Sequence, residues 1–544
     1  MTNTLFYGDN LGILRDHVAD ESIDLIYLDP PFNSNRTYNV LFKEKSGDAS
    51  PAQIEAFNDT WQWDRSAEKQ YDELVIDGPA NVSQMISAMR QFLGSNDMMA
   101  YLVMMAARLI ELHRVLKPTG SLYLHCDPTA SHYLKIVLDA VFSPRFFRNE
   151  IVWKRRTGSS SAVHGGHKFG AVTDAILFYT KTEISTFNPQ YTMTAAGYQD
   201  YVESTFRFVD ENGRRYRIAD LANPAYRPNL IYEYKGYKPP ANGWAISRAK
   251  MEQWEKEGRL EFPKTSSGRI QRRRFLDELK GKPVQNLWDD IDFIQSQAGE
   301  RLGYPTQKPL ALLERIISAS SNPGDVVLDP FCGCGTAVIA AQKLGRQWIG
   351  IDVTHLAISL IKYRLEDSFP GIEFDVKGEP ADEGAARMLA EADRYQFQWW
   401  ALSLVKAKPI EGKEKKGADK GIDGVIVFVD DVSRKAKRCL VQVKSGGVNS
   451  GTMRDLVGTL QRENAELAML VTLEQFSGPM RTESVEAGFY DSPGWGRSYP
   501  KVQIITIGEL LSGKKPDLPP ARQTFQQSPV IGESVQQKAL DLAD

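Results

Sequence analysis

The sequence predicts an α/β protein with a doubly wound parallel sheet, followed by a second, smaller α/β domain. Short apolar runs that end at an acid or a proline alternate with segments of helical periodicity, and this is the pattern of parallel strands joined by crossover helices. The length of 544 residues exceeds one ordinary domain. The composition, with 42% hydrophobic and 25% charged residues, is that of a globular protein.

The expected strands of the first sheet are short apolar runs with abrupt ends, at 22–31 (SIDLIYLDPP), 121–127 (SLYLHCD), 323–330 (PGDVVLDP) and 346–352 (RQWIGID). Helices are expected between them over 98–116 and 337–344. In the second domain we expect one amphipathic helix over 387–404, strands in 421–431 and 437–446, a helix over 453–466 and a strand over 467–472. Right-handed crossovers would bring the carboxyl ends of the parallel strands to one edge.

The charge is unevenly distributed along the chain. The net charge is −3, but residues 145–310 hold 27 Lys and Arg against 19 Asp and Glu, with Trp and Tyr interleaved. A basic segment with aromatic residues suits the phosphates and bases of a nucleic acid, although a solvated charged surface is the simpler alternative. The expected DNA contacts are in two clusters: Lys154, Arg155 and Arg156, and Arg272, Arg273 and Arg274.

Cysteine content and hydropathy favour a cytoplasmic protein without a membrane partner. Four cysteines are too few to stabilise a chain of this length by disulfides, and the first residues do not have a signal-peptide pattern. No apolar run reaches the roughly 18 residues of a membrane span. Cys332 and Cys334 lack the second pair of a zinc site and are expected to be small buried residues. His164 and His167 are expected to be loop residues rather than metal ligands.

A glycine-rich loop follows the third strand, in DPFCGCGT (329–336). Glycines let backbone approach a ligand at a helix N-terminus, and the loop has no basic residue to meet a pyrophosphate. The acid at the strand end suits a ligand that carries an ammonium group. Asp352 closes the next strand, where a carboxylate can accept hydrogen bonds from ribose hydroxyls. A nucleoside that bears an amino acid meets both requirements.

This loop is similar to the S-adenosylmethionine loop of DNA amino-methyltransferases, and DPPF (29–32) resembles their catalytic tetrapeptide. The order of the two motifs, with a basic region between them, resembles the β class, and the likeness spans about residues 1–370. It implies a seven-stranded, Rossmann-like methyltransferase domain. The cofactor-binding residues it implies are Asp9, Asn10, Thr306, Lys308, Pro309, Asp329, Phe331, Gly333, Gly335, Thr336 and Asp352.

The tetrapeptide also fits the chemistry of an exocyclic amine, whose lone pair is delocalised into the base. Asp29 can accept one amino hydrogen, a carbonyl held by the stiff Pro30–Pro31 turn can accept another, and Phe32 can stack on a base that has left the duplex. Aspartate at the first position resembles the adenine-N6 enzymes more than the cytosine-N4 enzymes, and cytosine stays the alternative. A methyltransferase acting on RNA is a weaker alternative.

The second domain places an acid, an amide and a lysine on neighbouring strands. Asp423 precedes one strand, and Gln442 and Lys444 share a face of the next because alternate strand residues point the same way. Asp423 and Gln442 could hold Mg²⁺, and Lys444 could orient the nucleophile for phosphodiester cleavage. This resembles the Mrr-like fold of the PD-(D/E)xK restriction endonucleases over about 387–512. The preceding helix offers Gln398 instead of an acid, so a non-cleaving DNA-binding domain is the alternative.

Together these expectations describe a methyltransferase fused to an endonuclease, acting on double-stranded DNA in restriction-modification or phage defence. A homodimer and separate restriction or defence subunits are left open as further partners. The expected segments are the catalytic half of the methyltransferase (1–144), a target-recognition insert (145–305), the cofactor-binding half (306–372), a linker (373–386), the endonuclease domain (387–512) and a flexible tail (513–544).

Overall fold

The computed structural model describes most of the chain. It covers residues 2–31, 62–126, 129–155, 170–193, 198–263, 265, 268–295, 300–302, 304, 306–410, 421–430 and 436–519, with the backbone alone at 37–41 and 53–58. These residues form two compact units, Pro189–Asp290 and the remainder of the chain on either side. Among the described residues, no helix has both the length and the apolar character that crossing a bilayer requires.

The larger unit contains a mixed, mainly parallel sheet. Its strands run in the order β6-β7-β5-β2-β15-β16-β1-β17. They are β6 (Phe147–Lys154), β7 (Thr173–Thr180), β5 (Leu116–Cys126), β2 (Ile23–Leu28), β15 (Val326–Asp329), β16 (Gln347–Asp352), β1 (Thr4–Tyr7) and β17 (Asp375–Lys377). Pairing is parallel from β5 to β17, and β7 is antiparallel to β5 and β6. The expected doubly wound α/β sheet is therefore confirmed.

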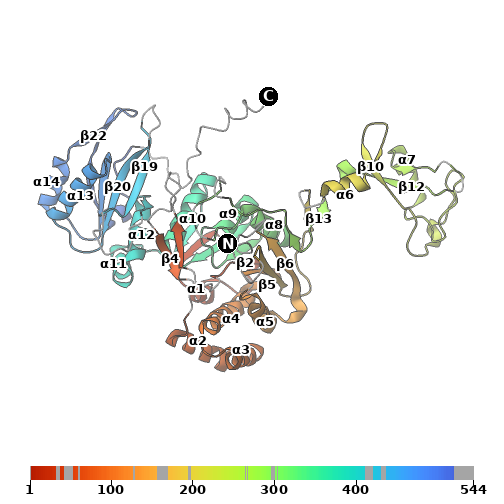
Figure 1. Ribbon diagram of the computed structural model, residues 1–544, viewed down its shortest axis with the longest axis horizontal. Helices are drawn as coiled ribbons and strands as arrows, with labels where there is room; N and C mark the ends of the chain where they lie inside the picture. The colour runs from red at the N-terminus through yellow and green to blue at the C-terminus, as the bar shows by residue number, and fades with distance from the viewer. Residues whose placement is uncertain are drawn as a thin grey trace. The chain divides into compact units, whose positions relative to one another are not determined.

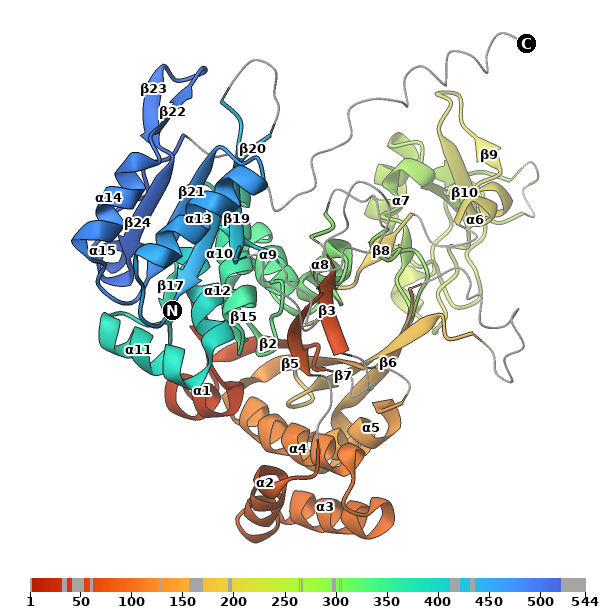
Figure 2. The same cartoon turned by 60° about the vertical axis from the view of Figure 1, so that its left-hand side comes forward.

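Helices cover both faces of this sheet (Figures 1 and 2). On one face lie α1 (Asn10–His17), α4 (Asp97–Val115) and α5 (Ser131–Phe142), and on the other α8 (Leu310–Ser320), α9 (Thr336–Lys343) and α10 (His355–Ser368). The helices α2 (Arg65–Ile76) and α3 (Ala80–Leu93) pack outside α4. The apolar face of α4 is completely buried at positions such as Leu102 and Leu109, and forms the main core with β2 and β5.

The carboxyl-terminal domain is built on its own sheet, in the order β18-β19-β20-β21-β24. Its strands are β18 (Lys408–Pro409), β19 (Gly424–Phe428), β20 (Lys437–Lys444), β21 (Leu467–Thr472) and β24 (Val502–Thr506). One core lies under α12 (Arg394–Leu404) and α15 (Ile507–Leu511), and another under α13 (Ser450–Arg462) and α14 (Gly478–Glu486). Because both faces are covered, β21 is buried at every position.

The helix expected over 387–404 is wrong in one respect, because the structure has two helices there. The first, α11 (Glu383–Ala392), ends at Asp393, and α12 begins immediately after it. Asp393 has extended backbone angles, and its carboxylate accepts hydrogen bonds from the backbone amides of Tyr395 and Gln396. An N-cap of this kind starts a new helix and breaks the old one.

Ordered elements also occupy parts of the segments expected to connect or trail the domains. Strand β17 and the start of α11 fall within 373–386, the expected linker. The expected tail, 513–544, lies outside the described residues from position 520 onward. The domain boundaries therefore stay predictions.

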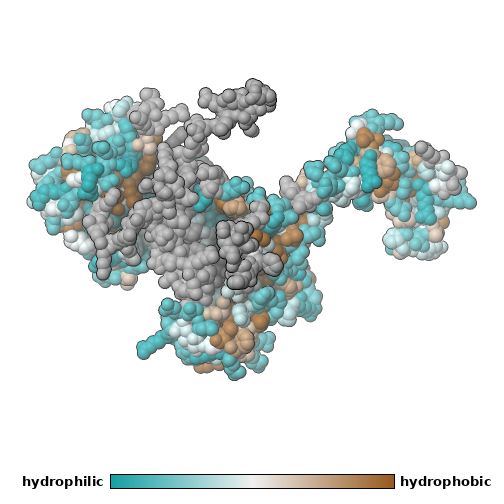
Figure 3. Space-filling model, viewed as in Figure 1, coloured by the Kyte–Doolittle hydropathy of each residue, from teal (hydrophilic) through white to brown (hydrophobic). Residues whose placement is uncertain are grey.

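The unit Pro189–Asp290 has a small antiparallel sheet, in the order β11-β12-β10-β9. Its strands are β9 (Phe208–Val209), β10 (Arg215–Ala219), β11 (Leu260–Glu261) and β12 (Gln271–Phe275), with α6 (Tyr198–Thr205) and α7 (Arg248–Lys256) beside them. A separate core contains the completely buried Trp244, Met251 and Ile270. The visible face of this unit is largely hydrophilic (Figure 3).

Candidate active site

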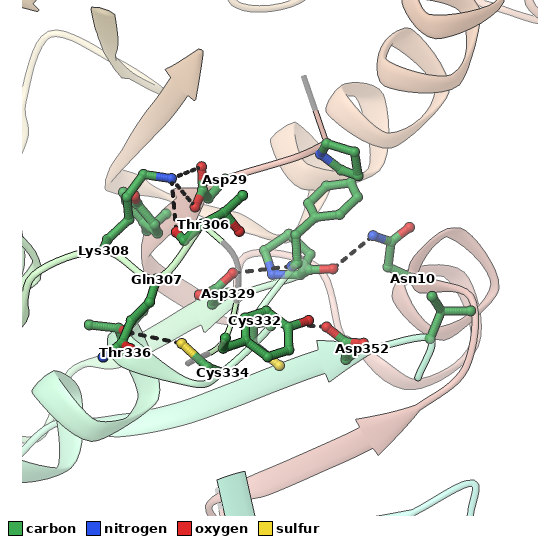
Figure 4. A pocket seen from close by; sticks show the side chains of 18 of the residues that line it. Asn10, Asp29, Thr306, Gln307, Lys308, Asp329, Cys332, Cys334, Thr336 and Asp352 are labelled. Carbon is green, nitrogen blue, oxygen red and sulfur yellow. Dashed lines mark hydrogen bonds and ion pairs between the residues drawn. The ribbon is translucent and has the colours of Figure 1, made fainter. Parts of the chain in front are cut away.

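A pocket lies at the carboxyl edge of the large sheet, where β1, β2, β15 and β16 end. It encloses about 300 Å³ and is lined by residues from all four strand ends, among them Asp9, Asp29, Asp329 and Asp352. Figure 4 shows Asp29, Asp329 and Asp352 with Lys308 and the glycine-rich loop around the same cavity. The structure thus brings together motifs that are more than 300 residues apart in the sequence.

The glycine-rich loop folds tightly between β15 and α9. Gly333 and Gly335 both have left-handed backbone, with φ of +49° and +78°. A Cβ on Gly335 would lie 2.6 Å from Ile361 Cγ1, so this position also lacks room for a side chain. The Cys332 amide donates to the Ile351 carbonyl at 3.0 Å, which fixes the loop against the end of β16.

Asp352 ties the loop to the following helix. One carboxylate oxygen accepts from the Gly333 amide at 2.9 Å, and the other accepts from the Thr354 amide and hydroxyl, both at 2.9 Å. Burial raises the pKa of Asp352 to about 6, and these hydrogen bonds partly oppose the shift. Asp329 is only 4% exposed, and burial with the nearby charges of Asp29 and Asp352 raises its pKa well above the usual range.

Asp9 and Asn10 are held at the opposite wall by a buried arginine on α4. Arg108 Nε donates to Asn10 Oδ1, and Arg108 Nη2 donates to Asp9 Oδ1, both at 2.5 Å. Asn10 in turn donates to the Pro330 carbonyl at 2.7 Å. The turn after β1 is therefore tied to the turn after β15.

Asp29 and Lys308 form a close ion pair within the pocket. Lys308 Nζ lies 2.7 and 2.5 Å from the two carboxylate oxygens of Asp29, and 3.4 Å from the Thr306 carbonyl. Thr306 has a φ of +63°, which is unusual for a residue with a branched side chain. Both side chains of the ion pair are largely buried. Lys308, expected at the cofactor, thus contacts the expected catalytic acid.

The remaining motif residues lie in different environments. Pro31, Phe331 and Thr336 line the pocket, whereas Pro30 is buried beside it and Pro309 caps the start of α8. Cys332 and Cys334 are buried, and burial raises the pKa of both thiols. Phe32, Arg156, His164 and His167 lie outside the described residues.

A second set of candidate residues meets in the carboxyl-terminal domain. One carboxylate oxygen of Asp423 accepts from the Val443 amide at 2.7 Å, and the other accepts from Gln398 Nε2 at 2.9 Å. Val443 stands between Gln442 and Lys444 on β20, so the carboxylate reaches the strand that carries both. Gln442 is 6% exposed, and its Oε1 has no hydrogen-bond partner among the described residues.

The expected DNA contacts have different environments in the two units. In the larger unit Lys154 is exposed, and Arg155 pairs with the buried Asp174 at 3.2 Å. In the smaller unit Arg272, Arg273 and Arg274 all lie on β12. Arg272 stacks over Trp254 and Arg273 bonds Glu261 at 2.7 Å, whereas Arg274 is exposed.

Arg108 and Tyr304 are pocket residues that sequence reasoning missed. Arg108 directly follows the apolar run LVMMAA (102–107), and a buried cation after such a run is a signal for a specific polar partner. Tyr304 lines the pocket and packs near Gly333, but lies in a segment without periodicity.

Comparison with known proteins gives a family match in both parts of the chain. Residues 23–362, more than half of the chain, match the family model for DNA methylases, and residues 389–488 match a restriction endonuclease model of the Mrr type. The type II methyltransferase M.EcaI of Enterobacter cloacae is 26% identical over 367 residues, covering 67% of this chain and 69% of the relative. The DNA adenine methyltransferase YhdJ of Escherichia coli K12 is 26% identical over 364 residues, covering 67% and 82%.

Among solved structures, the complex of M1.HpyAVI with S-adenosylmethionine (SAM) aligns over 66% of this chain and 99% of its own, with 16% identity and a TM-score of 0.31. The methylase match supports S-adenosylmethionine as the cofactor and DNA as the substrate. Both resemblances expected from the motifs are confirmed. The chain belongs to the DNA methylase family and carries a restriction endonuclease domain at its carboxyl end.

Proposed function

We propose that the protein methylates adenine N6 in double-stranded DNA and that its carboxyl-terminal domain cleaves DNA with Mg²⁺. The observation that carries the first part is the pocket in which Asp29 faces Asp329 and the glycine-rich loop. Cytosine N4 is the alternative acceptor, since the same pair of acceptors would serve either amine. The names of the similar adenine enzymes favour adenine.

The acids of the pocket suit the two polar ends of S-adenosylmethionine, which supplies an electrophilic methyl group. Asp352 would accept from the ribose hydroxyls. Asp329, at the end of β15, would hold the ammonium group, whose positive charge would favour the ionised form of this buried acid. Asp9 and Asn10, fixed by Arg108, would contact the adenine part.

Asp29 would hold the target amine for attack. Its carboxylate would accept one amino hydrogen, and the carbonyl of Pro30 would accept the other, so that the lone pair of the nitrogen points toward the methyl group. The Pro30–Pro31 pair limits backbone motion at this point, because both φ angles are fixed by the rings. Lys308 would keep the carboxylate oriented.

Methyl transfer from radiolabelled cofactor to duplex DNA tests this assignment. We expect Asp29→Asn to lower kcat by about 10–100-fold, the cost of losing a charged acceptor in the transition state, while leaving cofactor affinity nearly unchanged. Asp16→Asn, at an exposed position of α1, is the matched control. Sequencing of the methylated product identifies the base, and full activity of Asp29→Asn would contradict the proposed role.

The proposed Mg²⁺ site consists of Asp423 and Gln442. Among the described residues, Oε1 of Gln442 has no hydrogen-bond partner, and it is a buried acceptor of the kind that a hard cation binds. Mg²⁺ commonly takes only one or two protein carboxylates and completes its shell with water and phosphate, for which it supplies a Lewis acid. Lys444 follows on the same face and would stabilise the attacking oxygen.

Cleavage of unmodified duplex DNA with Mg²⁺, and its loss in Lys444→Ala, tests the endonuclease. Lys515→Ala, at an exposed position shortly after α15, should cut normally. If no substrate is cut although the DNA binds, the domain is a non-cleaving DNA-binding module. One observation favours this alternative. Gln398, which bonds Asp423, stands where similar endonucleases often carry an acid that would add a metal ligand.

A further inference from the structure

Helix α12 packs against different partners on two opposite sides. Gln396 and Trp399 are three positions apart and share one face, whereas Gln398 points to the opposite side at about 100° per residue. The first face lies against α10, and the opposite side lies on the sheet of the endonuclease domain (Figure 2). All of these elements belong to the same compact unit.

The first face contacts the wall of the cofactor pocket. The His355 amide, at the first residue of α10, donates to Gln396 Oε1 at 2.9 Å. His355 follows Thr354, which bonds Asp352 directly. Trp399, only 8% exposed, packs in one cluster with Tyr304 and Cys334, both of which line the pocket.

On the opposite side of α12, Gln398 bonds Asp423, the candidate metal ligand. Gln398 Nε2 donates to Asp423 Oδ1 at 2.9 Å, while the other oxygen of Asp423 is held by the Val443 amide. A cation that binds Asp423 would share this carboxylate with the Gln398 amide, whose hydrogen bond orients the carboxylate and draws on its negative charge. A shift of α12 that moves Gln398 would therefore change how tightly Asp423 binds a cation.

The packing around Trp399 leaves room for such a shift. Tyr304 lines both the cofactor pocket and a second cavity of about 80 Å³ between α10 and α12. Protein interiors rarely leave space of this size between packed helices, so the side chains here can repack without first opening a gap. Lys406 and Glu366, which join the helices at the far end, are exposed and pair at 3.2 Å.

We propose that α12 couples the two active sites, so that cofactor in the methyltransferase pocket and metal at Asp423 change each other's affinity. The inference rests on the proposed Mg²⁺ site. A ligand that fixes Tyr304 and the turn at Asp352 would favour one position of α12, because Trp399 and Gln396 contact these parts of the pocket wall. That position in turn sets the distance of Gln398 from Asp423. Because binding free energies are linked, the effect must be the same in both directions.

Calorimetry on the full-length protein without DNA tests the coupling. The dissociation constant of S-adenosylhomocysteine, measured with saturating Mg²⁺ and with EDTA, should differ by about fivefold or more. The Mg²⁺ dissociation constant should change by the same factor with and without S-adenosylhomocysteine. Agreement of the S-adenosylhomocysteine constants within about twofold, with Mg²⁺ bound, would overturn the coupling alone. Failure of Mg²⁺ to bind in either state would overturn the metal site as well.

Two variants test whether α12 connects the two sites. Gln396→Ala and Trp399→Phe should reduce the change in each dissociation constant to below about twofold, while each ligand still binds. Gln461→Ala, at an exposed position of α13, should keep the full factor. If both α12 variants also keep the full factor and melt like the wild type, α12 is not the connection.

Discussion

Lys308 Nζ lies 2.7 Å from Oδ1 of Asp29, although the two residues are 279 positions apart in the chain. The pair joins the end of β2 to the segment that leads into α8. A lysine in this motif could instead bind the carboxylate of the cofactor. The sequence alone does not distinguish that role from a contact with the catalytic acid, and the structure shows the contact with Asp29.

Lys308→Met is expected to impair chemistry more than cofactor binding. Without the ammonium group, the buried Asp29 carboxylate loses a charge-assisted hydrogen bond worth about 1.5–3 kcal/mol, which corresponds to a fall of about 10–100-fold in kcat. Single-turnover methylation and cofactor calorimetry measure the two effects separately. Lys343→Met, at a more exposed ion pair on α9, is the control. A weaker affinity with normal kcat would instead assign Lys308 to the cofactor.

Cofactor affinity should depend on pH through Asp352. Its pKa is raised by burial to about 6, and the ionised form is the one that accepts from ribose hydroxyls. Protonation of Asp352 should therefore leave affinity unaffected well above pH 6 and lower it up to about tenfold per unit below that, because protonation competes with binding. Calorimetry across this range should show a weaker and shallower profile for Asp352→Asn. Asp375→Asn, exposed on β17, should follow the wild-type curve.

Gly335→Ala should destabilise the protein more than Gly345→Ala. The two glycines have similar φ angles, +78° and +72°, so both substitutions carry the cost of left-handed backbone, about 1–2 kcal/mol. Only the new Cβ at 335 would overlap Ile361, at 2.6 Å, whereas Gly345 has open space. Overpacking adds about 1–3 kcal/mol. Denaturant titrations compare the free energies of unfolding, and equal losses would show that steric overlap is unimportant.

The strands that carry the site could be predicted because their ends are marked locally. The apolar runs before Asp29, Asp329 and Asp352 stop at an acid, with prolines after the first two, and the structure ends β2, β15 and β16 at these points. Strand β21 has the predicted bounds as well. Parallel order then places the three acids on one edge.

What the sequence could not supply is the pairing of distant side chains. Arg108 with Asp9, and Gln398 with Asp423, depend on how whole helices pack against the sheets. The break at Asp393 was missed for another reason. An aspartate is tolerated on the exposed face of a helix and is also a strong N-cap, so local periodicity fits either one helix or two.

Arg273 and Arg274, which are neighbours on β12, should contribute differently to DNA binding. Arg274 is exposed, so Arg274→Ala should weaken binding and reduce the slope of log affinity against log salt by about one, the amount expected for one lost phosphate contact. Arg273 already bonds Glu261 at 2.7 Å and lies over Tyr216. Arg273→Ala should therefore leave the salt slope unchanged and instead lower the stability of the insert. Fluorescence anisotropy with labelled duplex DNA at several salt concentrations measures the slopes, and equal slopes for the two variants would contradict this division.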